Sequence, residues 1–190
     1  MTPHGASRPK GNRRVALIAI AGLAVTAVLY FVGRNVLSTS SYSVTGLFGQ
    51  TGVGVLSLKS LLATVALGLA VVQVGLAAWM YGKLPFAGRA GKPIRLTHRV
   101  IGAAAFLVTL PVAIHCATAY GVKLTDWRIV VHSIAGCFLY GAFVAKVLLV
   151  HTKKLPGWAL PVAGGILAVL ILVLWYTAGL YYYNGYSVPI

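Results

Sequence analysis

Acidic residues are almost absent from this chain. Asp126 is the single Asp or Glu among 190 residues, against sixteen Lys and Arg, and the formal net charge is +15. None of the long apolar runs contains a carboxylate, the group that would balance a cation or relay protons in a membrane transporter, which argues against a transporter or metal channel. In the connection "TDW" we expect Thr125 to cap the next helix, with Asp126 in its first turn, where a carboxylate suits the helix dipole.

Cysteine is also scarce. The two cysteines, Cys116 and Cys137, fall inside apolar runs and do not have the spacing of metal ligands. We expect both to be small buried hydrophobic residues. The chain likewise contains no nucleotide-binding motif, no catalytic-triad motif and no soluble domain.

Apolar residues are abundant, at 59% of the chain. They form five runs that approach the roughly 20 residues needed to cross the hydrocarbon core of a bilayer. The sequence therefore predicts an all-α membrane helix bundle, in which residues 15–190 form one five-helix domain. The predicted spans are 15–37, 56–81, 96–120, 128–150 and 158–183.

Basic residues lie in short clusters between the apolar runs. This distribution argues against nucleic-acid binding, for which they would gather on one face of a folded domain. Most of them fall in the N-terminal tail and in the second-to-third and fourth-to-fifth connections, on one side of the predicted bundle. The positive-inside rule then places the N-terminus in the cytoplasm and the C-terminus outside, in a multi-pass protein of the plasma membrane.

The two ends of the chain differ in character. Residues 1–14, which include His4, are expected to be a disordered basic tail. The first apolar run is too long for a signal-peptide core and no convincing cleavage site follows it, so we interpret it as a membrane span. Trp175, Tyr176 and residues 181–183 are expected to form an aromatic belt at the outer interface.

Four of the five histidines fall on two consecutive spans. His98 and His115 belong to span 96–120, while His132 and His151 lie in or beside span 128–150. Consecutive spans run antiparallel, and both pairs are nested about the same short connection, "GVKLTDW". His115 should therefore meet His132 near the outer side, and His98 should meet His151 near the cytoplasmic side.

Two imidazoles from facing helices, at two depths, are what axial ligation of two haems requires. Gly102 and Gly136 each follow a histidine by one helical turn, where a large side chain would block a porphyrin. Pro111 is expected to kink the helix near the outer site. We expect two haems, or a single one at His115 and His132. The simpler alternative is that each histidine is an ordinary interface residue.

The motifs "LTHRVIG" and "VHSIAGCFLYGAF" resemble the helix openings of the di-haem transmembrane cytochromes b, the group that includes ferric reductase-like and ascorbate-reducible cytochromes. Over most of its length the chain also resembles small actinobacterial five-helix membrane proteins. The resemblance to the cytochromes implies haem B and electron transfer across the membrane. The iron ligands it implies are His98, His115, His132 and His151.

Further expectations concern partners and charge. No flavin or nicotinamide domain is present, so the electron partner would be a quinol, a small reductant or another redox protein. Arg99, near the inner pair, and Arg128, near the outer pair, are candidates for neutralising haem propionates. Lys146 lies deeper in its span and is expected to snorkel to the cytoplasmic surface.

A different class of function stays open, namely a non-catalytic accessory or assembly subunit without a cofactor. Its helices would pack through small-residue faces, such as Thr64 with Gly68 and Gly164 with Ala168. Formation of an oligomer is compatible with this class and with a cytochrome.

Overall fold

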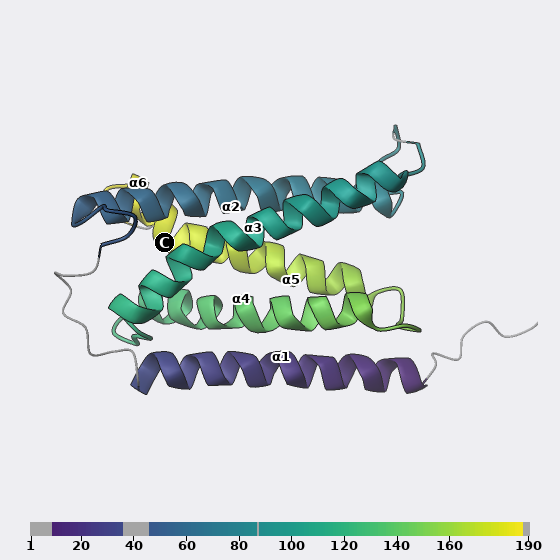
Figure 1. The fold of residues 1–190 in the computed structure, drawn as a ribbon, viewed down its shortest axis with the longest axis horizontal. Helices are drawn as coiled ribbons and strands as arrows, with labels where there is room; N and C mark the ends of the chain where they lie inside the picture. Colours follow the sequence, from purple (N-terminus) through teal and green to yellow (C-terminus); the bar gives the residue numbers. More distant parts are fainter. Residues whose placement is uncertain (1–8, 36–45, 87, 188–190) are drawn as a thin grey trace, which may run out of the picture.

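The computed structural model describes residues 9–35, 46–86 and 88–187, which form an all-helical bundle (Figure 1). The five long helices are α1 (Pro9–Asn35), α2 (Val53–Met80), α3 (Lys92–Ala119), α4 (Trp127–His151) and α5 (Ala159–Leu174). Without a break, α5 continues into a π-helix, η1 (Trp175–Leu180), and a last short helix, α6 (Tyr181–Tyr183). With α5 to α6 counted as one span, all five are long and apolar enough to cross a membrane, which confirms the predicted fold class.

The helices follow the predicted spans closely, with one clear difference in the predicted tail. Because α1 begins at Pro9, residues 9–14 are helical, and the prediction of a disordered tail is wrong for them. Arg14 fixes this segment, since its Nη1 donates a hydrogen bond of 2.9 Å to the carbonyl oxygen of Lys153 in the α4–α5 connection. The remainder of that tail, with His4, and the end of the first predicted span at 36–37 lie outside the described residues.

Figure 1 shows how the helices lie relative to one another. Helix α4 packs against α1 and α5, and α2 packs against α3, α5 and η1. Helix α3 crosses the bundle obliquely, so that its end approaches the start of α4 while its beginning lies beside the end of α2, away from the end of α4. One end of the bundle holds the start of α1 and the α2–α3 and α4–α5 connections, and we call it the basic end. The opposite end holds α6, and we call it the tyrosine end.

Small residues bring α1 and α4 into close contact. A Cβ added at Gly22 would lie 2.8 Å from the carbonyl oxygen of Gly141 and 2.9 Å from Cβ of Ala145. A Cβ added at Gly141 would in turn collide with Thr26 and with the carbonyl oxygen of Gly22. Small residues one turn apart on both helices therefore allow the two backbones to approach.

The small-residue faces that the sequence suggested are placed differently. A Cβ added at Gly68 would meet nothing within 4 Å, so this position lies on an open face of α2. Thr64 instead accepts a hydrogen bond of 3.0 Å from Nε1 of Trp175. At Gly164 the nearest group is Nζ of Lys146, 3.7 Å from an added Cβ, so this face receives a lysine side chain from α4.

The start of α4 differs from the prediction by one residue. Asp126 is the N-cap itself, with extended backbone angles, and its Oδ1 accepts a hydrogen bond of 3.1 Å from the N–H of Ile129. Thr125, the expected cap, donates its hydroxyl proton to Asp126 Oδ2 at 3.4 Å. The carboxylate takes the cap because it accepts from a free N–H and also compensates the positive end of the helix dipole.

Candidate functional site

The tyrosine end carries the predicted outer histidines. His115 lies near the end of α3 and is buried, with 6% of its surface exposed. Its ring is in edge-to-face contact with that of Tyr120, with 5.7 Å between the ring centroids. His132 lies on the second turn of α4, which begins at Trp127, and is partly buried. The oblique course of α3 brings its end and the start of α4 to the same region of the bundle (Figure 1).

The hydrogen bonds around His132 favour one tautomer of its ring. Its Nδ1 lies 2.9 Å from the hydroxyl oxygen of Thr177. The Thr177 hydroxyl faces the carbonyl oxygens of Val173, at 2.8 Å, and Leu174, at 3.3 Å, in its own helix; when it donates to them, its oxygen accepts from His132 Nδ1–H. In the neutral imidazole the proton is then on Nδ1, and the lone pair of Nε2 is available for a ligand.

The π-helix η1 places Thr177 against α4. The Thr177 side chain is 1% exposed, and its carbonyl oxygen accepts a hydrogen bond of 2.9 Å from Nη1 of Arg128. One residue of η1 thus binds two side chains of α4, Arg128 and His132. Single π-turns within α-helices occur frequently at functional sites. The sequence predicts this segment as part of the span 158–183, with Trp175 and Tyr176 in an aromatic belt, because the helical pattern does not reveal where a π-turn falls.

Two cations flank the histidines at this end. Nζ of Lys59, on α2, lies 4.4 Å from the centroid of the Tyr120 ring and 3.4 Å from its hydroxyl oxygen. The guanidinium of Arg128 lies 3.8 Å from the centroid of the Tyr181 ring. Lys59 lies inside the predicted span 56–81, and a cation within a span is the signal that could have identified it.

The basic end does not bring its two histidines together. His98 lies on the part of α3 that packs on α2, and its carbonyl oxygen accepts a short hydrogen bond from Gln73. His98 Nδ1 is buried and has no hydrogen-bond partner among the described residues. His151 is exposed on the last turn of α4, and its Nδ1 donates to the carbonyl oxygen of Val147, in its own helix, at 2.8 Å. Figure 1 shows these ends of α3 and α4 diverging.

The remaining predicted site residues lie at helix contacts or on the surface. A Cβ at Gly102 would lie 2.7 Å from Nε2 of Gln73, so this glycine makes room for α2. Gly136 faces Leu174 of α5, 3.9 Å from an added Cβ. Arg99 is exposed on α3. Nζ of Lys146 lies against Gly164 of α5, 3.7 Å from an added Cβ.

Aromatic side chains connect α3 and α4 between the two histidine levels. Phe106 stacks on Phe143 with 3.8 Å between centroids and 10° between planes. Tyr140 donates its hydroxyl proton to Thr109 at 3.1 Å. Phe106 lies about midway between His98 and His115 along α3, so this contact separates the two levels.

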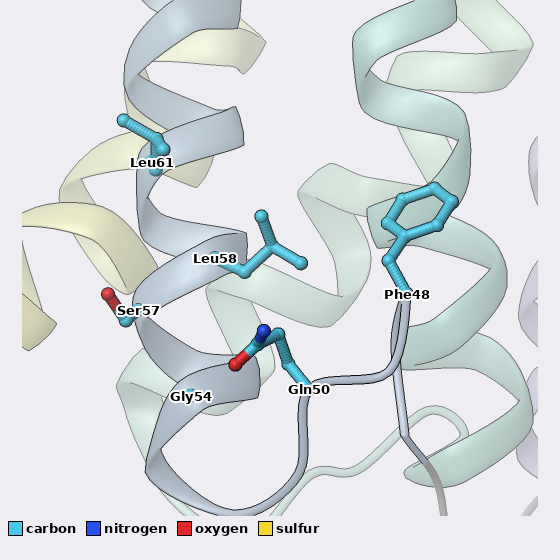
Figure 2. A pocket seen from close by; sticks show the side chains of 6 residues that line it. All are labelled: Phe48, Gln50, Gly54, Ser57, Leu58 and Leu61. Carbon is cyan, nitrogen blue, oxygen red and sulfur yellow. The ribbon is translucent and has the colours of Figure 1, made fainter.

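A hollow opens beside the start of α2, with a volume of about 360 Å³. Figure 2 shows Phe48 and Gln50 of the preceding loop facing Leu58, with Ser57 and Leu61 on the same helix. None of the described residues that line this hollow has a titratable side chain.

A b-type haem requires two imidazole nitrogens for its iron and charge partners for its two propionates, and the tyrosine end carries residues of both kinds. His115 and His132 supply imidazoles, the second with Nε2 unprotonated, and Lys59 and Arg128 supply two positive charges. No group of three His, Cys, Asp or Glu that could hold a metal ion occurs among the described residues, and axial ligation needs only two.

Fold and site together define a five-helix polytopic membrane protein with a cluster of histidines and cations at one end. The chain belongs to a family of unknown function, DUF6529, whose model matches residues 15–190. No curated protein and no solved structure matches the chain.

Proposed function

We propose that this protein is a b-type cytochrome of the plasma membrane, with His115 and His132 as the ligands of a haem at the tyrosine end. The observation that carries the proposal is the hydrogen bond from His132 to Thr177, which leaves Nε2 of a partly buried imidazole free to bind iron. Haem B would supply one-electron redox chemistry when bound. The residues of the chain hold and orient it.

Each residue of the site has a defined part in this proposal. Thr177 fixes the tautomer and the ring orientation of His132. The burial of His115 limits access of water to the site. Tyr120 lies against His115 on one side, and Arg128 lies one turn from His132 on the same face of α4, toward the tyrosine end.

The proposal covers one haem, because the structure brings one histidine pair to the same region. A second haem at His98 and His151 requires the beginning of α3 to move toward the end of α4. The electron partner would be a quinol, a small reductant or a redox protein that reaches the site from the tyrosine end.

The test is an optical spectrum of the detergent-purified protein, oxidised and dithionite-reduced, together with its haem content. We expect about one haem per chain, with the sharp reduced bands of bis-histidine ligation. His115→Ala and His132→Ala should lose the haem, and His151→Ala, at an exposed position, should keep it.

Other outcomes separate the alternatives. About two haems per chain, falling to about one in His98→Ala, would show that both pairs ligate. A folded protein that purifies colourless from haem-replete cells would contradict the proposal and favour an accessory subunit.

A further inference from the structure

Among the described residues, the cations of the tyrosine end have no acidic partner. Asp126 is the chain's single acidic side chain, and its carboxylate is occupied by Ile129 N–H and the Thr125 hydroxyl at the start of α4. No ion pair with Lys59 or Arg128 occurs within the described ranges. Both cations lie over tyrosine rings and donate to uncharged oxygens, Lys59 to the Tyr120 hydroxyl and Arg128 to the carbonyl of Thr177. Cation–π contacts offset part of the cost of removing a charge from water but do not neutralise it.

The position of the two cations makes this imbalance costly. Lys59 is seven residues into α2, a helix of membrane-spanning length, and Arg128 is on the first turn of α4. Ionisable residues inside spans are expensive and mark ligand or ion sites. Each cation contacts a residue that touches one of the two histidines. Lys59 lies over the ring of Tyr120, which contacts the His115 ring, and Arg128 donates to the carbonyl oxygen of Thr177, whose hydroxyl lies 2.9 Å from His132 Nδ1.

We propose that Lys59 and Arg128 together form a binding site for carboxylates at the tyrosine end. A planar guanidinium suits a carboxylate by paired hydrogen bonds, and a lysine adds a point charge from the other side. The site suits a ligand that carries two carboxylates. It also suits a ligand that carries one carboxylate and a second group that reaches the histidines. Tyr120 and Tyr181 form its aromatic walls.

The carboxylates have two possible sources. If the carboxylates are the propionates of the haem, this inference rests on the proposed function. If they are not, they belong to a small free carboxylate that enters from the aqueous side of the tyrosine end. The chemistry of recognition is the same, and a suitable experiment separates the sources.

The first arm compares reconstitution of the purified full chain with haem B and with its dimethyl ester, which lacks both charges. If the propionates are bound, the wild type should prefer haem B by about tenfold or more, the effect of one charge-assisted hydrogen bond. Lys59→Gln and Arg128→Gln should lose this preference. Lys123→Gln is the matched control, since Lys123 lies in the α3–α4 connection, outside the helices that carry the site.

The second arm measures the thermal midpoint of the chain without haem, with succinate or with sodium chloride at equal ionic strength. A rise with succinate alone, lost in Lys59→Gln and Arg128→Gln, would support the site with a free carboxylate as its source. If the midpoint rises in this way but neither haem B nor its ester binds, the carboxylate site is supported and only the proposed function fails.

One combination overturns the inference. If the wild type binds haem B and its ester equally and succinate does not raise the midpoint, no carboxylate site exists, although the proposed function stands. Lys59→Arg keeps the charge and should behave as the wild type, so that a folding defect of Lys59→Gln is distinguished from loss of the site.

Discussion

At the scale of single residues, Thr177 is the side chain that determines what His132 can do. It accepts the Nδ1 proton of His132 and is itself almost fully buried. We predict that Thr177→Val, which preserves the shape but removes the acceptor, destabilises the protein by about 1–3 kcal/mol, because a buried N–H loses its partner. Thermal unfolding in detergent measures this change, and the haem spectrum should shift or weaken in the same variant.

The matched control is Thr118→Val. Thr118 is exposed on α3 and donates only to carbonyl oxygens of its own helix, at Ile114 and His115. Its loss should change stability by no more than a few tenths of a kcal/mol. Equal effects of the two substitutions would contradict the role given to Thr177.

The sequence predicted the residues of the site only in part. The nested spacing of His115 and His132 identified two side chains that the fold brings to one end of the bundle. The acceptor of the His132 proton was missed, because Thr177 reaches α4 through a π-turn that hydrophobic periodicity does not report. Gly102 was assigned to a porphyrin, whereas its position against Gln73 depends on the packing of α3 on α2.

At the scale of helices, the contact of α1 with α4 depends on the absence of side chains. We predict that Gly141→Ala destabilises the bundle by about 1–3 kcal/mol, because the new methyl group overlaps Thr26 and the carbonyl oxygen of Gly22. A lower thermal midpoint, with faster proteolysis of α1, would show that this helix has separated from α4.

Gly68→Ala is the same chemical change at a position without neighbours. An added Cβ meets nothing there, so the helix should gain about 0.5–1 kcal/mol from reduced backbone freedom in the unfolded chain. Opposite signs for the two glycines would confirm that the close approach is local to α1 and α4. Destabilisation by both would indicate a partner on the open face of α2.

The positions of the helices in the sequence could be predicted, whereas the angles at which the helices cross in the bundle could not. Long apolar runs gave all five spans within a few residues, because crossing a bilayer fixes both length and composition. The oblique course of α3 depends on which side chains meet, including the stacking of Phe106 on Phe143. Hydropathy carries no such information, so the divergence of His98 from His151 could not be read from their spacing.

At the scale of the whole molecule, the distribution of charge predicts orientation in the membrane. Arg14, Lys83 and Lys153 all lie at the basic end, so this end should face the cytoplasm. Ser187→Cys, exposed at the tyrosine end, should react with a membrane-impermeant maleimide in intact cells. Lys83→Cys should react only after lysis.

The unsubstituted chain serves as control, because its two cysteines lie within α3 and α4. Labelling of Lys83→Cys in intact cells, without labelling of Ser187→Cys, would mean that the basic end is outside. The orientation also bears on function, since it fixes the side from which His115, His132 and the two cations are reached. With the tyrosine end outside, the proposed electron partner and any free carboxylate would arrive from the extracytoplasmic side, and the optical changes should follow reagents that cannot cross the membrane.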